Sequence, residues 1–275
     1  MATLLARHCS KLRSSRRLIS TAAKPGFFEL RSDHIKPDSM RSYLDDVQRT
    51  ADARMRVMPG FLGMWKTELG GSVSMVHHLY HWTSYDERDA ARDLAADDPI
   101  LYGTVSRTET LANMTLPLPS LRASLSDSRS MIMNEATDCL AAAGRPGALA
   151  YAPPPNLAKA ADVSSPVAYE MRTYQLHLGY ATVPTFLGLY GAGLQDKLAA
   201  DDSGASELCT LLYSDCGSLN VVIEIWRHRS LEGQMQSRVA SRKAGKWRAA
   251  IDEIAGIAHT FETAMMRPVP SSPWR

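Results

Sequence analysis

The feature that most constrains the fold of this chain is an internal repeat. The paired strings are FELR at 28–31 and YEMR at 169–172, LYHW at 79–82 and IWRH at 225–228, and SMIM at 130–133 and AMMR at 264–267. Three matches in the same order indicate a duplicated unit. Coincidence between short apolar strings explains that shared order less well.

Both halves show the same order of strand and helix signals, β-α-β-β-α-β. The expected strands lie at 27–34, 61–69, 73–82 and 129–134, and at 167–176, 207–214, 219–226 and 262–267. The expected helices lie at about 38–58 and 84–96, at 181–200 with a break at its glycines, and at 230–259. A capping box, Ser84 with Glu87, begins the second of these helices.

This order predicts an α+β fold made of two tandem ferredoxin-like units. Each unit has a four-stranded antiparallel sheet with helices on one face, which leaves the other face bare. Two such faces can cover each other in a dimeric α/β-barrel arrangement. The sequence leaves open whether that barrel closes within one chain or between two.

The first 26 residues differ in composition from the rest. Residues 1–26 carry six basic groups and no acidic group. This is typical of a mitochondrial transit peptide, and the alternative is a disordered basic tail. Without those six groups the overall formal charge of +2 becomes −4, so we expect no nucleic-acid partner. No run approaches the roughly 20 apolar residues that span a bilayer, so we expect no transmembrane segment.

Proline and alanine concentrate between the two halves, at 139–166, which predicts a linker. The expected organisation is therefore a transit peptide at 1–26, a first unit at 27–138, the linker, and a second unit at 167–275.

Three histidines of one expected strand, His77, His78 and His81, are candidate metal ligands. On a strand His77 and His81 share a face about 13 Å apart, and His78 points to the other face. Zinc holds its ligands at about 2 Å, so no two of these histidines can share one ion unaided. The cysteines at 139, 209 and 216 lack metal or disulfide spacing. We therefore expect no metal site and no cofactor.

His78 shares its strand face with Tyr80 and Trp82, which makes this face a candidate for ligand binding. If it lines the barrel, it can bind an aromatic or planar molecule, with Trp65 and Trp226 as further candidate cavity residues. The alternative is a histidine that is hydrogen-bonded within an aromatic core wall.

Arg88 and Arg92 lie one helical turn apart and are a candidate anion-binding pair. The alternative is ion pairing with the acidic residues within 86–93, which the acidic surroundings favour. No glycine-rich phosphate loop, nucleophile elbow or triad is visible in the sequence. Nothing in the sequence compels catalysis.

Several strings resemble the NIPSNAP family. They are FELRS at 28–32, YEMRTYQL at 169–176, GFLGMWKTELGG at 60–71 and, most specifically, VHHLYHWTSYDER at 76–88 followed by Arg92. The chain departs from the family pattern at Tyr80, where the family often has Trp. In the second half, Gln234 replaces the first arginine and Gly233 replaces the capping glutamate.

The resemblance implies a mitochondrial protein, located in the matrix, with domains of the dimeric α/β-barrel type. It implies action through protein–protein binding, with mitochondrial or autophagy-related proteins as partners in mitochondrial quality control, and a homodimer as a further option. It implies no agreed reaction. The second hypothesis is a small-molecule-binding barrel, either a carrier or a monooxygenase-like enzyme, that holds its ligand between the sheets.

Overall fold

The computed structural model describes residues 26–98, 100–101, 121–153 and 167–275. The strands are β1 (Phe27–Ile35), β2 (Phe61–Leu69), β3 (Met75–Trp82), β4 (Leu125–Glu135), β5 (Ala168–Leu176), β6 (Ser206–Cys216), β7 (Val221–His228) and β8 (Ala258–Pro268). The helices are α1 (Met40–Arg49), α2 (Ala51–Val57), α3 (Tyr85–Asp97), α4 (Thr137–Ala142), α6 (Thr182–Ala200), α7 (Leu231–Ser241) and α8 (Gly245–Ile257), with a 3-10 turn at Leu121–Ser124.

The eight strands form one closed barrel in the order β1-β3-β2-β8-β5-β7-β6-β4. Each half contributes four adjacent strands, β4-β1-β3-β2 and β8-β5-β7-β6, with antiparallel pairing inside each half. The halves join at two antiparallel seams, β2 with β8 and β4 with β6. Both seams pair the second strand of one unit with the last strand of the other. The predicted tandem ferredoxin-like fold is confirmed, and the barrel closes within a single chain.

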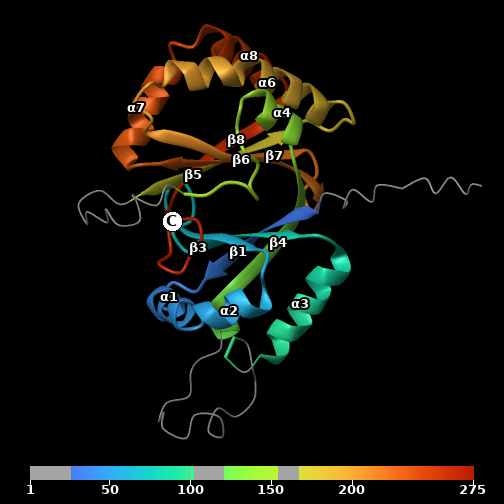
Figure 1. Ribbon diagram of the computed structural model, residues 1–275, viewed down its shortest axis with the longest axis vertical. Coiled ribbons are helices and arrows are strands. Elements are labelled where there is room, and N and C mark those ends of the chain that lie inside the picture. The colour runs from blue at the N-terminus through green and yellow to red at the C-terminus, as the bar shows by residue number, and fades with distance from the viewer. Residues whose placement is uncertain (1–25, 99, 102–120, 154–166) are drawn as a thin grey trace, which may run out of the picture.

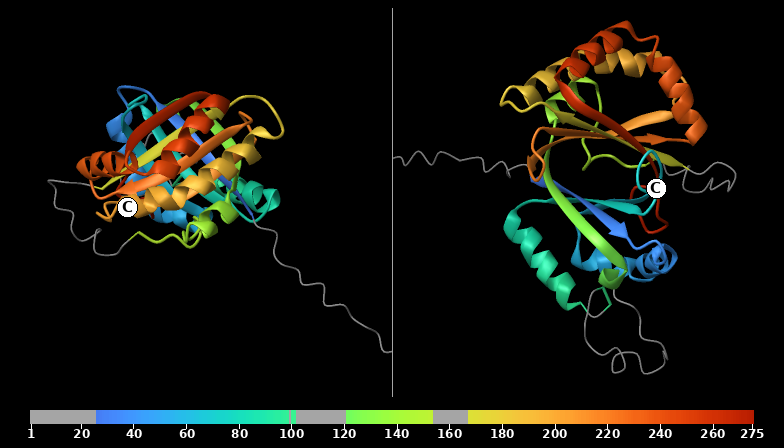
Figure 2. Two further views of the ribbon diagram at one scale, coloured as in Figure 1. Left: turned by 90° about the horizontal axis from the view of Figure 1, so that it is seen from above. Right: turned by 180° about the vertical axis from the view of Figure 1, so that it is seen from behind.

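The molecule is layered as helices, sheet, sheet, helices (Figure 1). Helices α1, α2 and α3 cover the outer face of the first sheet, and α6, α7 and α8 cover that of the second, as the view from behind also shows (Figure 2). This leaves three apolar cores, one under each helical layer and one between the sheets.

Side chains from both units fill the space between the sheets. Phe28 and Leu30 of β1 and Trp65 of β2 pack in one cluster with Tyr169 of β5 and Ile223 of β7, each at most 4% exposed. Burial of large side chains of this kind supplies the main stabilisation of the fold. The two sheets therefore meet through a packed interior.

Two chain segments outside the strands also enter this interior. Ala148 and Tyr151 follow α4, and Trp274 lies next to the last residue of the chain. The Trp274 ring lies 4.9 Å from the Tyr151 ring and 5.9 Å from the Trp65 ring, measured between centroids. The Trp274 amide donates a hydrogen bond to the Leu62 carbonyl at 3.1 Å. In Figure 1 the C-terminus accordingly lies between the two halves.

The helices differ from the expected ones in three places. The helix expected at about 38–58 ends at Arg49 and restarts at Ala51, because the Thr50 hydroxyl bonds back to the Asp46 carbonyl at 2.8 Å. The helix expected at 230–259 is two helices, α7 and α8.

The expected break at the glycines of 181–200 is wrong, because α6 runs unbroken from Thr182 to Ala200. Gly193 gives α8 room to approach: a Cβ there would lie 3.0 Å from the Ala250 Cβ and from the Trp247 Cα. The glycine thus serves helix packing rather than a helix stop.

Two of the expected segments fall mainly outside the described residues. The transit peptide at 1–26 lies outside them except for Gly26. Within the expected linker at 139–166 the structure describes residues 139–153, where α4 packs its buried Leu140 among residues of the second helical layer.

Candidate functional site

The aromatic face of β3 lies under the helices of the first unit, on the outer side of the sheet. His78 Nε2 lies 3.3 Å from the Tyr43 hydroxyl of α1, and Arg54 of α2 donates to the Tyr80 hydroxyl at 2.7 Å. Trp82 packs in the same helix-side core. The condition that this face lines the barrel is therefore not met, because the helices rather than the second sheet cover it.

The two further cavity candidates point in opposite directions. Trp65 lies in the barrel interior with its ring centroid 5.3 Å from that of Tyr169. Trp226 lies on the helix side of β7, where Lys197 Nζ stands 3.6 Å from its ring centroid. The structure therefore does not bring together the five residues of the predicted cavity. Their role in ligand binding stays a prediction.

His77 occupies the opposite face of β3 and is hydrogen-bonded on both ring nitrogens. Its Nδ1 lies 2.8 Å from the Ser32 hydroxyl and its Nε2 lies 3.2 Å from the Thr67 hydroxyl. Burial lowers the pKa of His77 to about 4, and the neighbouring His78 adds to that effect. The ring is therefore neutral at physiological pH, and each of its nitrogens has a hydroxyl partner.

His78 and Asp33 form a buried pair on the helix side. Asp33 accepts hydrogen bonds from Arg31 at 2.7 Å and Ser128 at 2.6 Å, and its Oδ2 lies 3.3 Å from His78 Nε2. Burial would raise the pKa of Asp33, but these partners hold it well below its usual range. Burial lowers the pKa of His78 to about 4, because the Asp33 charge only partly offsets it and the Arg54 charge adds to it. At neutral pH, Asp33 is charged and His78 is neutral.

Glu29 of β1 is the central polar residue of the first unit, and it is fully buried. Arg88 of α3 grips it through two nitrogens, Nε to Oε2 at 2.9 Å and Nη2 to Oε1 at 3.1 Å. Arg92 donates to Oε1, Ser130 donates to Oε1 at 2.5 Å, and the Trp82 indole donates to Oε2 at 3.1 Å. Burial would raise the pKa of Glu29, but Arg88, Ser130 and Arg92 lower it to about 2.

Sequence reasoning foresaw ion pairing of Arg88 and Arg92 but not this partner. Both arginines bind Glu29, which is distant in sequence, and Arg88 also binds its neighbour Asp89 at 2.9 Å. The signal was present, because the repeat places Glu29 and Glu170 at matching positions of an apolar strand. A buried acid at a repeated position requires a cation nearby.

A polar pocket of about 300 Å³ opens beside this cluster; we call it the basic pocket. It lies between α3 and the outer faces of β1 and β4, and Met58 and Ala95 form its apolar wall. The polar lining consists of Arg31, Arg88, Arg92, Arg122, Arg129, Ser128 and Ser130. Among the residues that the structure describes, none of those lining it is acidic. The predicted anion-binding pair thus stands among further basic groups.

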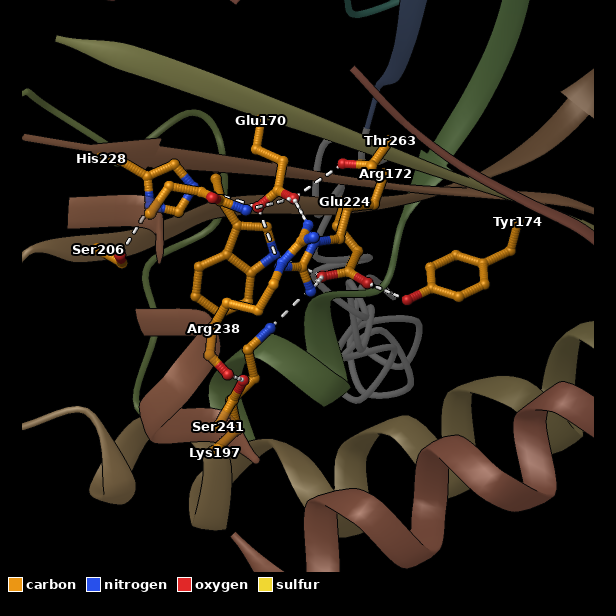
Figure 3. A network of polar contacts seen from close by, with 12 residues as sticks. Glu170, Arg172, Tyr174, Lys197, Ser206, Glu224, His228, Arg238, Ser241 and Thr263 are labelled. Atoms are coloured by element: carbon orange, nitrogen blue, oxygen red, sulfur yellow. Dashed lines mark hydrogen bonds and ion pairs between the residues drawn. The ribbon is translucent and has the colours of Figure 1, made fainter. Parts of the chain in front are cut away.

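The second unit has a corresponding cluster around Glu170 of β5, which is also fully buried (Figure 3). Its Oε2 accepts from Arg172 at 3.0 Å and lies 3.2 Å from His228 Nε2. Its Oε1 accepts from Arg238 at 3.0 Å and from Thr263 at 2.8 Å. Burial would raise the pKa of Glu170, but His228 and Arg172 hold it well below its usual range.

A second buried acid, Glu224 of β7, adjoins this cluster. It accepts hydrogen bonds from the hydroxyls of Tyr174 at 2.7 Å and Tyr190 at 2.8 Å, and also from the Trp226 indole. Lys197 of α6 stands 3.9 Å from its Oε2, between the rings of two tryptophans. Burial lowers the pKa of Lys197 well below its ordinary value, and the nearby Arg172 charge adds to that effect.

The described part of the chain contains neither a metal-binding cluster nor a membrane-spanning helix. No cluster of three or more His, Cys, Asp or Glu side chains there could hold a metal ion. No helix among the described residues has the length and apolar character needed to cross a membrane.

Comparison with known proteins agrees with the duplicated architecture. The model of the NIPSNAP family matches the chain twice, at residues 28–115 and 169–273, which correspond to the two units. The chain belongs to the NIPSNAP family. Protein NipSnap homolog 3A from Homo sapiens is 22% identical over 248 residues, which make up 90% of this chain and 85% of that protein.

Solved structures share the full barrel at low sequence identity. A protein from Lactobacillus acidophilus proposed to be a monooxygenase aligns with a TM-score of 0.52 and 7% identity, over 89% of this NIPSNAP chain and 94% of that one. A second protein of that description, from Fusobacterium nucleatum, gives a TM-score of 0.51 and 9% identity over 89% and 92%. These likenesses concern the fold alone.

Proposed function

We propose that this NIPSNAP chain is a mitochondrial matrix protein that acts by binding other proteins through its outer surface, in mitochondrial quality control. The observation that carries the proposal is an apolar groove at one end of the second unit. The groove encloses about 550 Å³, between the loop from β5 to α6 and the hairpin from β6 to β7. Its lining is Leu178, Gly179, Tyr180, Val183, Pro184, Leu187, Tyr213, Ser214, Leu219 and Asn220.

The groove presents large side chains to solvent on a fixed loop. Leu178 is 90% exposed and Tyr180 is fully exposed. The Asn220 amide donates to the carbonyls of His177 at 2.8 Å and Gly179 at 3.2 Å, which holds the loop in place. Exposed apolar groups on a rigid support are typical of a protein-binding site, because little ordering entropy opposes binding.

The corresponding loop of the first unit is polar. There the chain passes from β1 to α1 through Lys36, Pro37 and Asp38. The apolar groove thus belongs to one unit and is not a general consequence of the fold. None of the described residues that line it is charged, so we assign it to an uncharged segment of a partner protein that inserts an apolar side chain.

A photoreactive benzoylphenylalanine at position 178 tests this assignment. Irradiation in a mitochondrial extract should crosslink one partner segment, which is then synthesised and titrated against the purified protein. We expect Leu178→Ser to weaken binding about tenfold or more. Leu94→Ser, at a leucine of α3 that is 62% exposed outside the groove, is the matched control. Equal weakening by both variants, or no crosslinked segment, would overturn the assignment.

The proposed location in the mitochondrial matrix is tested separately. The basic, acid-free segment 1–26 supports import into mitochondria, as does the family membership. A fluorescent fusion of the full chain should enter the matrix, and a fusion lacking 1–26 should stay outside. Identical distributions of the two fusions would refute the address.

The alternative function is a small-molecule carrier or monooxygenase-like enzyme with its ligand between the sheets. The fold shared with the two proposed monooxygenases favours it. The packing of Trp65, Tyr169 and Trp274 in that space weighs against it. Native mass spectrometry of freshly purified protein decides: a bound small molecule that is lost on Trp65→Ala supports the alternative, and a mass equal to that of the chain alone rejects it.

A further inference from the structure

We propose that the first part of β4 is a dimerisation surface, where a second copy of this chain adds its own β4 as an antiparallel strand. The strand β4 continues beyond the seam that closes the barrel. It pairs with β6 only over residues 132–135, whereas it pairs with β1 over residues 125–133. Within the described part of the chain, residues 125–131 therefore have a partner strand on one side only. The outward N–H and C=O groups of such an edge are a template for another strand.

The turn between β6 and β7 limits how much of this edge a partner strand can reach. A Cβ on Gly217 of that turn would lie 2.9 Å from Met131 Cγ, so the turn already occupies the position beside Met131. Residues 126–130 precede this contact, and each of them is exposed. The side chains of Asp127 and Arg129 are 55% and 82% exposed. We call residues 126–130 the β4 edge.

The sequence of the β4 edge, SDSRS, is complementary to itself in antiparallel pairing. When two copies pair about a two-fold axis at Ser128, Asp127 of each copy lies opposite Arg129 of the other, and serines lie opposite serines. Side chains directly opposite each other on neighbouring strands have Cβ atoms about 5 Å apart, and opposite charges at this distance stabilise the pair. One symmetric contact therefore forms two ion pairs between the copies.

The charged side chains of the β4 edge are available for such a contact. Ser128 points to the helix side of the sheet, where its hydroxyl donates to the buried Asp33 at 2.6 Å and ties β4 to β1. Asp127 and Arg129 alternate with it and leave the opposite face of the strand. Arg129 donates to Asp127 at 3.0 Å, a contact between exposed groups that contributes little to stability. Charges of one sign on an edge repel a second copy, whereas this order of opposite charges attracts one.

The last strand of the second unit, β8, has a similar edge without this pattern. It pairs with β5 over residues 258–266 but with β2 only over residues 265–268, so its first part also has one partner strand in the described chain. In two-fold pairing about the exposed Phe261, Glu262 lies opposite Thr260 and faces no cation. The fold therefore supplies an edge in both units, but only the β4 edge carries self-complementary charges.

The test is sedimentation equilibrium of the purified full chain between about 10 μM and about 1 mM, because so short an interface should give a weak, reversible dimer. Arg129→Asp gives the β4 edge two acids, and Asp127→Arg gives it two arginines. The double variant with both changes restores opposite charges in the reverse order. The matched control is Glu262→Arg, which reverses an exposed charge on the edge of β8. Thermal unfolding checks that every variant folds.

We expect each single variant of the β4 edge to weaken self-association about tenfold or more, and the double variant and the control to stay within about twofold of the parent chain. An equimolar mixture of the two single variants should associate more strongly than either alone, because acids then face arginines. A chain that stays monomeric at about 1 mM overturns the proposal. So does a dimer that both single variants leave unchanged, since another surface then holds it, and so do assemblies of more than two copies, which a two-fold contact cannot form.

Discussion

The two units place a fully buried glutamate at the same position of their first strand, yet they satisfy it differently. Glu29 is bound by two arginines of one helix, and both keep part of their surface in water, at 21% and 30% exposure. Glu170 is bound by Arg172 of its own strand, which is 13% exposed, by a buried histidine, and by Arg238 of α7, which is 44% exposed. Each carboxylate thus binds an arginine that reaches the surface, but only Glu170 also has an arginine of its own strand and a histidine packed beside it.

The two units therefore share the buried glutamate but differ in the cations that bind it. The acid in each case ties the helical layer to the sheet, through α3 in one unit and α7 in the other. Where the cations reach the surface, they can also contact a ligand. Where a cation is buried, as Arg172 is beside Glu170, it serves the stability of the fold.

Removing the charge of each acid gives the largest expected effects. Glu170→Gln should lower the free energy of unfolding by about 3–5 kcal/mol, because it leaves Arg172 buried beside a neutral group. Glu29→Gln should cost about 2 kcal/mol, because Arg88 and Arg92 can turn to water. Urea unfolding followed by circular dichroism measures both. Equal losses would show that the exposure of the cations does not matter.

The next largest expected effect is a loss of stability at acidic pH, which arises mainly in the first unit. His77 and His78 have pKa values lowered to about 4, whereas an unfolded histidine titrates near 6.5. As the pH falls below about 6.5, the unfolded chain takes up protons that the folded chain refuses, so stability is lost on the way to pH 4. By pH 5 the loss should be about 2 kcal/mol for each of these histidines.

A comparison of variants sharpens this expectation. The second unit has Ile223 and Glu224 at the corresponding positions, and its one similar group is His228, whose pKa burial also lowers. Unfolding should be measured between pH 7 and pH 5 for His77→Gln with His78→Gln, and for His228→Gln. The double variant should flatten the pH dependence more. A steeper slope in the double variant would contradict the assigned protonation states.

The sequence allowed the architecture to be predicted but not which strand face is inside. Period-two patterns and the repeat located all eight strands, because each follows local spacing. However, β3 is buried on both faces, so neither face is marked by solvent-exposed polar residues. Whether His78 faces the helices or the barrel interior depends on packing between segments that are distant in the sequence. The seams β2–β8 and β4–β6, which close the barrel within the chain, likewise depend on contacts beyond any local pattern.

The candidate site was accessible from the sequence only in part. Arg88 and Arg92 were identified from their spacing on a helix, which periodicity predicts well. Glu29 could not be linked to them from local spacing, since this strand residue binds a helix 59 positions further along the chain. Arg122 and Arg129 are among the residues that line the basic pocket because β4 pairs alongside β1. This pairing of distant strands cannot be read from local sequence patterns.

Converting one unit toward the other gives a smaller effect. Arg88→Gln copies the second unit, where Gln234 makes a single hydrogen bond to Glu170 at 3.2 Å. The loss of the two-nitrogen grip on Glu29 should cost about 1.5 kcal/mol. The reverse change, Gln234→Arg, should bring no gain, because Arg172 and Arg238 already surround that carboxylate. A stabilising Gln234→Arg would mean that Glu170 is short of positive charge.

The smallest expected effects concern the helix that carries the arginines in each unit. The Ser84 hydroxyl accepts from the Glu87 amide at 3.1 Å, and the Ser230 hydroxyl accepts from the Gly233 amide at 3.0 Å. Ser84→Ala and Ser230→Ala should therefore each cost about 1 kcal/mol. Glu87→Ala should add a few tenths of a kcal/mol in the first unit only, because its carboxylate also accepts from the Thr83 amide at 2.6 Å. Thermal unfolding of the three variants side by side measures this.

Gly233 explains why the second unit lacks that extra contact, and it supplies the control. A Cβ at this position would lie 3.3 Å from the Ala205 Cβ at the entry to β6, tighter than an ordinary contact. Gly233→Ala should therefore yield less than the stabilisation of about 0.8 kcal/mol that alanine usually brings to a helix. Gly256→Ala in α8, where a Cβ meets open space, should yield that gain in full. If both changes stabilise equally, close packing against Ala205 is not what keeps a glutamate out of the second capping position.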